Sequence, residues 1–113
     1  MVGEETEVKE ETLIERLEKL LESMKDWERK PVIQVGKAVV EIVKLPRRET
    51  SKRVEPERLA LHLRLEDSFK GIFIIDYEEF KDLQDALRNE KVKEVIEAIS
   101  EVNRKKKVIE FKL

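Results

Sequence analysis

The chain of 113 residues contains no cysteine, which excludes disulfides, zinc–thiolate sites and thiol catalysis. It has a single histidine, His62, and its three glycines, Gly3, Gly36 and Gly71, stand far apart. A histidine metal cluster and a phosphate-binding glycine loop are therefore excluded as well. These absences predict a protein that is not an enzyme and that holds no metal and no cofactor.

Long apolar runs are also missing, because no segment approaches the ~20 residues that cross a bilayer. Residues 1–11 are rich in glutamate, the opposite of a basic, apolar signal peptide. We therefore expect a cytoplasmic protein without a membrane span. We also expect an acidic flexible leader at residues 1–11, followed by a single domain at residues 12–113.

Charged residues are abundant, at 44% of the chain, with 24 Lys and Arg beside 26 Asp and Glu. Such a composition is typical of hyperthermophile proteins, in which ion pairs contribute to stability at high temperature. The charges are unevenly spread, and residues 31–60 hold seven basic and four acidic residues. Alternating blocks of charge indicate either complementary faces within one fold or a basic patch, and the totals leave both open.

The first element predicted is an amphipathic helix at residues 12–29. Thr12 and Glu15 form a capping box at its start, and Pro31 must end it. Its apolar residues follow a short heptad seam, which fits either a helix docked on its own domain or a dimer seam. The seam residues are Leu13, Leu17, Leu20, Met24 and Trp27.

Three strands are predicted after this helix. Residues 32–45 are rich in β-branched residues and read as a strand, with a bulge or bend at Gly36. Leucines alternate with polar residues at 59–65, which predicts a half-buried strand with His62 on its polar outer face. A short apolar strand follows at residues 72–75.

Apolar periodicity then predicts helices at about 77–89 and 91–103, separated by Asn89, and alternation at 107–113 predicts a closing strand. The order of elements predicts an α+β fold. An antiparallel sheet of three to four strands packs with helices, one N-terminal and two after the third strand.

A group of basic residues lies in or beside the first two predicted strands and in the polar segment 46–57. A sheet face with several Lys and Arg is what phosphate neutralisation needs. The alternative is a solvated arginine-rich loop that pairs with the acidic block at 76–90. The candidate nucleic-acid-binding residues are Lys37, Lys44, Arg47, Arg48, Lys52, Arg53, Arg64 and Lys70.

Short motifs over residues 33–89 resemble the transcriptional coactivator family called positive cofactor four. They are Ile33-Gln34-Val35-Gly36-Lys37, the strand Leu61 to Leu65 with Arg64, Lys70-Gly71-Ile72-Phe73-Ile74, and Glu78-Glu79-Phe80 with Leu83.

The resemblance implies a curved antiparallel sheet with one helix, dimerisation through that helix, and single-stranded DNA bound on an open sheet face. It also implies a phosphate contact for Lys37 and matches Arg64 and Lys70 to basic positions of the family. Leu45 and Asp67 stand where the family has aromatics, and Phe80 replaces a tryptophan.

Two functions are therefore predicted. The first is a coactivator-like protein that binds single-stranded DNA without catalysis. The alternative is a homodimeric protein–protein interaction or structural module that keeps the fold but binds no nucleic acid, its sheet covered by the helix at 12–29. The predicted dimer contacts are Leu13, Leu17, Leu20, Met24, Trp27, Phe80, Leu83 and Leu87.

Overall fold

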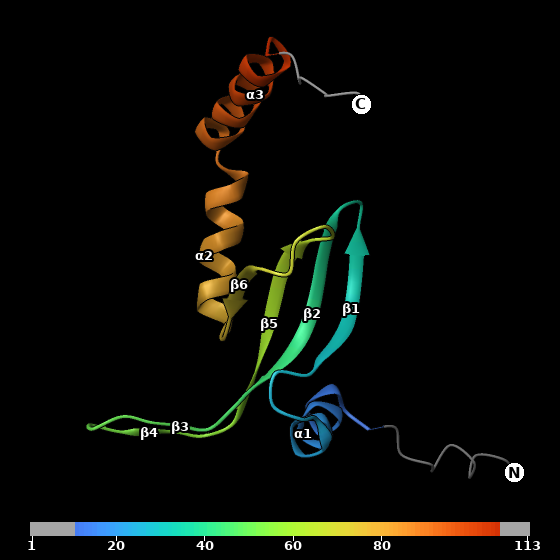
Figure 1. Ribbon diagram of the computed structural model, residues 1–113, viewed down its shortest axis with the longest axis vertical. Coiled ribbons are helices and arrows are strands. Elements are labelled where there is room, and N and C mark those ends of the chain that lie inside the picture. Colours follow the sequence, from blue (N-terminus) through green and yellow to red (C-terminus); the bar gives the residue numbers. More distant parts are fainter. Residues whose placement is uncertain (1–10, 107–113) are drawn as a thin grey trace, which may run out of the picture. The chain divides into compact units, whose positions relative to one another are not determined.

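The computed structural model of the protein describes residues 11–106, in which three helices and six strands occur (Figure 1). The chain forms two compact units. Met1–Ile75 holds the strands and the first helix, and Asp76–Leu113 holds the other two helices. The predicted α+β class, with an antiparallel sheet and two helices after the strands, is confirmed. The predicted closing strand at 107–113 and all but the last residue of the predicted leader lie outside the described residues.

Helix α1 spans Leu13–Ser23 and begins with the predicted capping box. The Glu15 N–H donates to the Thr12 hydroxyl at 3.1 Å, and the Thr12 N–H donates to the Glu15 carboxylate at 2.8 Å. Two amides of the first turn that have no partner within the helix are thereby satisfied.

Helix α1 ends six residues earlier than the prediction of 29, because the chain turns sharply after Met24. The Glu28 carboxylate accepts a hydrogen bond from the Lys25 N–H at 2.9 Å, and Trp27 takes a left-handed backbone conformation with φ of 67°. The Trp27 N–H donates to the Lys44 carbonyl at 2.8 Å. Trp27 therefore belongs to the edge of the sheet and not to a heptad seam, and the seam prediction was wrong at this residue.

Four strands form one antiparallel sheet in the order β1-β2-β5-β6. Their bounds are Arg29–Val35 for β1, Ala38–Leu45 for β2, Arg58–Leu65 for β5 and Gly71–Ile74 for β6. The single strand predicted at 32–45 is in fact a hairpin of β1 and β2. Val35 pairs with Ala38 across a two-residue turn, and Gly36 has φ of 57°, a conformation that favours glycine.

The polar segment 46–57 forms a second hairpin, β3 (Arg48–Glu49) with β4 (Val54–Glu55). Its turn is closed by Thr50, whose N–H donates to the Arg53 carbonyl at 2.8 Å. The hairpin continues β2 and β5 and extends away from the four-stranded sheet (Figure 1).

Strand β6 lies very close to β5 at its first residue, Gly71. A Cβ atom at this position would lie 2.0 Å from the Leu63 carbonyl oxygen. Only a glycine allows this approach, so the strand predicted at 72–75 begins one residue earlier, at Gly71.

Cross-strand pairing sorts the side chains of the sheet onto two faces. Glu41 on β2 pairs with His62 on β5, which pairs with Phe73 on β6, so these side chains share one face. We call this the charged face; it also carries Arg29, Val43, Ala60 and Arg64. The opposite face, the leucine face, carries Val40, Ile42, Leu61, Leu63, Leu65 and Ile72.

The charged face holds most of the buried residues, which reverses the prediction for β5. The cluster of Val43, Leu45 and Ala60 lies on this face, and His62 is only 1% exposed. The expectation of an outward His62 was wrong, because pairing places it beside the carboxylate of Glu41. The leucines of β5 that were expected to face inward are half-buried or exposed.

The second unit consists of helix α2 (Tyr77–Arg88) and helix α3 (Glu90–Arg104), close to the predicted bounds. The predicted break at Asn89 is confirmed. It caps the end of α2, and its side-chain oxygen accepts from the Lys91 N–H at 2.8 Å to begin α3. Within the part of the chain that the structure describes, none of the helices has the length and apolar character needed to span a bilayer.

Candidate nucleic-acid interface

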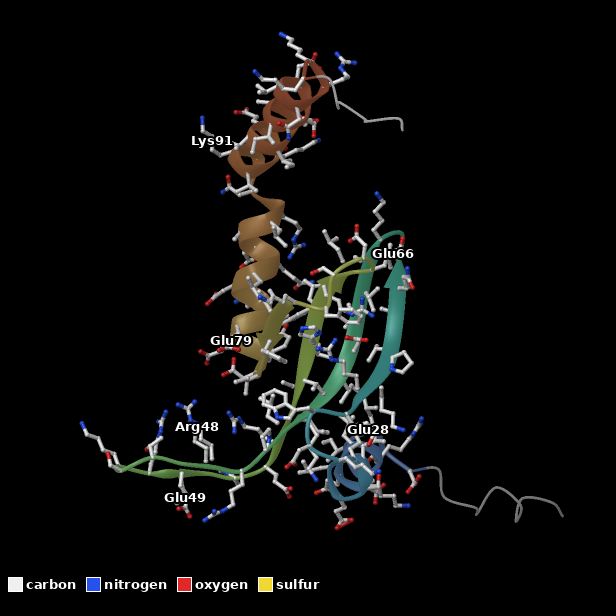
Figure 2. All side chains as sticks on the ribbon, viewed as in Figure 1. Glu28, Arg48, Glu49, Glu66, Glu79 and Lys91 are labelled. Carbon is white, nitrogen blue, oxygen red and sulfur yellow. The ribbon has the colours of Figure 1, made fainter. Side chains whose placement is uncertain are left out.

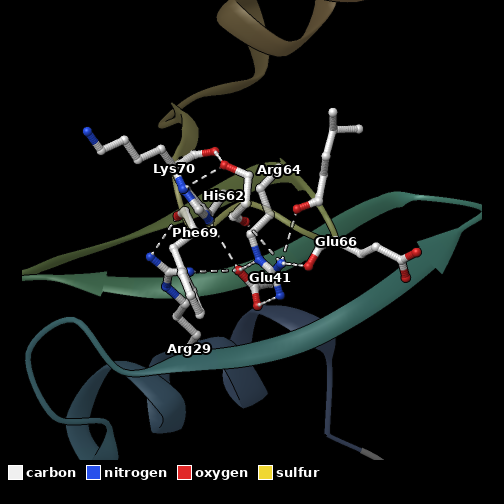
Figure 3. A network of polar contacts seen from close by, with 9 residues as sticks. Arg29, Glu41, His62, Arg64, Glu66, Phe69 and Lys70 are labelled. Atoms are coloured by element: carbon white, nitrogen blue, oxygen red, sulfur yellow. Dashed lines mark hydrogen bonds and ion pairs between the residues drawn. The ribbon is translucent and has the colours of Figure 1, made fainter. Parts of the chain in front are cut away.

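A buried carboxylate lies at the centre of the charged face (Figure 3). Glu41 is only 8% exposed. The Arg64 guanidinium donates two hydrogen bonds to its carboxylate, from Nε to Oε2 at 3.1 Å and from Nη2 to Oε1 at 3.2 Å. Arg29 Nη1 lies 3.5 Å from Oε2 and His62 Nδ1 lies 3.1 Å from it. The two-pronged contact is the strong, directional form of an arginine–carboxylate pair. We call these four residues the Glu41 cluster.

The Glu41 cluster carries an excess of positive charge, because two guanidinium groups face one carboxylate. The hydrogen bonds from Arg64 hold the pKa of Glu41 below its ordinary value near 4.5; the His62 bond and the charges of Arg64 and Arg29 add to this, and burial opposes it. An ionised carboxylate can only accept hydrogen bonds, so His62 donates through Nδ1–H. Among the described residues, every buried side-chain nitrogen and oxygen has a hydrogen-bond partner.

The two arginines also fix the connection between β5 and β6. Arg64 Nη1 donates to the carbonyls of Leu65, Glu66 and Ser68, each at 3.2 Å. Arg29 Nη2 donates to the Phe69 carbonyl at 3.4 Å. The backbone of this connection is therefore tied to the sheet by charge-assisted bonds, whereas the Phe69 side chain is 83% exposed.

Aromatic rings form a short row on the charged face. The Phe73 ring centroid lies 4.8 Å from the His62 ring and 6.2 Å from the Trp27 ring. Trp27 is 57% exposed and Phe73 is 42% exposed. Helix α1 thus leaves two aromatic rings of this face accessible to a ligand.

Two of the eight predicted nucleic-acid-binding residues have charged groups that are already bound by partners within the chain. Lys44 is 5% exposed, and its Nζ donates to the Met24 carbonyl at 2.9 Å and pairs with Glu57 at 3.2 Å. All three side-chain nitrogens of Arg64 donate hydrogen bonds to Glu41 or to backbone carbonyls. Neither residue presents a free cationic group to a phosphate.

Four further predicted residues lie on or beside the β3–β4 hairpin. Arg47 pairs with Glu49, and Arg53 pairs with Glu55 at 3.0 Å. Arg48 and Lys52 are exposed and have no ion-pair partner among residues 11–106. Figure 2 shows Arg48 and Glu49 on opposite sides of the hairpin ribbon.

The last two predicted residues, Lys37 and Lys70, lie at one end of the sheet. The Glu66 N–H donates to the Lys37 carbonyl at 2.8 Å, which brings the β1–β2 turn beside the β5–β6 connection. Both lysines are exposed. Lys70 also lines an open hollow of about 340 Å³ whose walls are mainly aliphatic side chains of the leucine face. The structure therefore does not bring the eight basic residues together at one place.

The predicted dimer contacts differ in accessibility. Met24 is buried within its own chain, whereas Leu13, Trp27 and Leu87 are exposed. The remaining four, Leu17, Leu20, Phe80 and Leu83, are half-buried.

Sequence reasoning missed Arg29, Glu41, Phe69 and Phe73, and it assigned Trp27 to a helix. Trp27, Phe69 and Phe73 are the only aromatic residues before Tyr77, so their scarcity was a usable signal. The Glu41 cluster carried no such signal, because it depends on the register of three strands. Within residues 11–106, no group of three or more histidine, aspartate or glutamate side chains is arranged to hold a metal ion.

Comparison of the chain with protein-family models, with curated proteins and with solved structures finds no match. The resemblance to the positive cofactor four family therefore rests on the short motifs alone.

Proposed function

We propose that the protein binds single-stranded nucleic acid along the charged face and does not catalyse a reaction. One observation carries this proposal: the exposed rings of Trp27 and Phe73 lie on the same face as the net positive Glu41 cluster. Proteins that bind single strands combine a cationic surface for the backbone with aromatic rings on which bases stack. The motif resemblance supports the same class of ligand and a coactivator-like role.

The bound strand would stack unpaired bases on Trp27 and Phe73. Phosphates would contact Arg29, which is partly exposed, while Arg64 stays on Glu41 and positions the face. Stacking needs unpaired bases, so single strands should bind better than duplexes. Aromatic stacking accepts every base, and we therefore expect little sequence preference.

A fluorescence anisotropy titration with a labelled oligonucleotide and its duplex at about 50 mM salt tests this function. Low salt favours electrostatic association. The single strand should bind more tightly, and the logarithm of its association constant should fall linearly with the logarithm of salt. With two to four phosphates neutralised the slope is about −1.4 to −2.8, from about −0.7 per phosphate. Equal or tighter binding of the duplex, or no binding of either, would refute the proposal.

A second candidate function is a homodimeric interaction module, favoured by the apolar surface that this chain exposes. Leu65 and Ile72 of the leucine face are exposed, as is Val35, which pairs with Ala38 beside Leu65. A row of apolar residues on α3 that includes Val95 and Ile99 is exposed as well. Contiguous apolar patches of this kind mark protein interfaces.

Light scattering of the full chain tests the second candidate. A homodimer should give a mass of about 27 kDa, twice the 13.4 kDa of the chain. A mass near that of one chain at micromolar concentration would contradict it. The two functions are compatible, since the leucine face and the charged face are opposite sides of the sheet.

A further inference from the structure

The β5–β6 connection combines a fixed backbone with an unusually exposed aromatic side chain. Three of its carbonyl groups, and that of Leu65 at the end of β5, accept hydrogen bonds from Arg29 or Arg64. Phe69 is nevertheless 83% exposed, so its ring adds little to the stability of the fold. Because the backbone of this connection is already ordered, binding of a partner to the exposed Phe69 ring would cost less conformational entropy. This arrangement favours a role for the ring in binding.

The residue that follows Phe69 in the chain is an exposed lysine, Lys70. The Ser68 hydroxyl accepts from the Lys70 N–H at 3.2 Å and donates to the Lys70 carbonyl at 3.1 Å, which fixes the backbone at Lys70. The Lys70 ammonium group is exposed and has no ion-pair partner among residues 11–106. An exposed aromatic residue followed by an exposed cationic residue offers one group for the flat base of a nucleotide and one for its anionic phosphate.

This pair of residues lies within reach of the aromatic row. Phe69 is four residues from Phe73, so their Cα atoms are at most about 14 Å apart. At about 3.4 Å per stacked nucleotide, that distance corresponds to about four nucleotides of one strand. Arg29 connects the two places directly, because it contacts Glu41 with one nitrogen and the Phe69 carbonyl with another.

We propose that Phe69 and Lys70 form a second nucleotide subsite, in which a base stacks on the Phe69 ring and its phosphate contacts Lys70. The inference rests on the proposed function, because the same strand occupies the aromatic row and this subsite. The row binds one end of a short single strand, and the Phe69 subsite binds a nucleotide a few positions further along.

Substitutions at Phe69 test the subsite with a thymidine oligonucleotide of about twelve residues, followed by anisotropy. Phe69→Ala should weaken binding by about 5- to 150-fold, the range expected for one stacked base. Phe69→Leu keeps the apolar bulk without the ring and should lose nearly as much, whereas Phe69→Tyr keeps the ring and should bind like the wild type. Because the side chain is exposed, the thermal unfolding midpoint should not change in any of the three.

Two different results separate the subsite from the proposed function. If the wild type binds and Trp27→Ala weakens binding while Phe69→Ala and Phe69→Leu do not, the subsite is refuted and the function stands. If the wild type shows no binding at about 50 mM salt, the proposed function fails and the subsite fails with it. Equal losses in Phe69→Tyr and Phe69→Ala would also refute stacking at this position.

Discussion

The Glu41 cluster and the β3–β4 hairpin are built from the same residue types but in opposite environments. In the cluster a glutamate with 8% exposure pairs with Arg64 and Arg29 and bonds to His62. At the start of the hairpin, Arg47 and Glu49 pair while each side chain remains 58% exposed. Both regions add to the high charge content, but only the cluster has a buried carboxylate at its centre.

The difference in burial decides what each region can contribute. An exposed ion pair is worth about 0–1 kcal/mol, because water screens the charges and two long side chains lose freedom. Breaking a buried pair costs about 3–5 kcal/mol, because the remaining charge is left without a partner. The cluster should therefore organise the sheet and the β5–β6 connection, whereas the hairpin pairs should mainly keep that hairpin soluble.

The largest expected effect comes from neutralising Glu41. Glu41→Gln leaves two guanidinium groups without their anion, and we expect it to lower the free energy of unfolding by about 3–5 kcal/mol. The matched control, Glu49→Gln on the hairpin, should lower it by less than about 1 kcal/mol. Urea denaturation at neutral pH measures both, and similar losses in the two variants would contradict the comparison.

The next effect concerns ligand binding at the charged face. Trp27→Ala and Phe73→Leu should each weaken single-strand binding by about 1–3 kcal/mol, since each removes a ring on which a base can stack. Tyr77→Ala is a control, because Tyr77 is an exposed aromatic of the second unit. Competition binding with one unlabelled single strand would rank the affinities of the three variants. If Trp27→Ala and Phe73→Leu lose no more affinity than Tyr77→Ala does, the result would argue against stacking on the aromatic row.

A smaller effect should appear in acid. The folded-state pKa of Glu41 is depressed, so its stabilising contribution is present above the ordinary value near 4.5 and is lost as the pH falls through that value toward the folded pKa. Glu15 and Glu28 also have lowered pKa values, but wild type and Glu41→Gln share them. The stability difference between these two proteins should therefore shrink below about pH 4.5, and a difference that stays constant down to pH 3 would contradict this assignment.

The smallest effect is expected from the hairpin cations. Changing Arg48 and Lys52 together to Gln removes the two unpaired cations of the β3–β4 hairpin and should reduce the magnitude of the salt slope by at most about 1.4. A salt titration of the variant measures this. A larger flattening would shift the binding surface from the charged face to the hairpin.

The sequence predicted the elements that depend on local chemistry. Thr12 with Glu15 predicted the start of α1, Asn89 predicted the break between α2 and α3, and the apolar run at 72–75 predicted β6 to within one residue. The hairpin at Gly36 was missed because apolar residues continue on both sides of the turn and conceal it.

The candidate site was harder to predict, because it depends on strand register. The leucines of β5 suggested which side faces the core, but pairing placed His62 and Glu41 on the more buried side. The basic residues were predicted to act as one group, yet a count of charges cannot distinguish Lys44, whose ammonium group is bound inside the chain, from Lys70, whose ammonium group is exposed. Trp27 was misplaced because a heptad pattern continued past the true end of α1.

The central claim is that a single strand stacks on the charged face, and Trp27 offers a direct test as the only tryptophan of the chain. Its fluorescence should be quenched to saturation when a single-stranded oligonucleotide is added at about 50 mM salt, and added salt should reverse the quenching. The corresponding duplex should quench it far less. A titration in which the oligonucleotide leaves the Trp27 fluorescence unchanged would contradict the account.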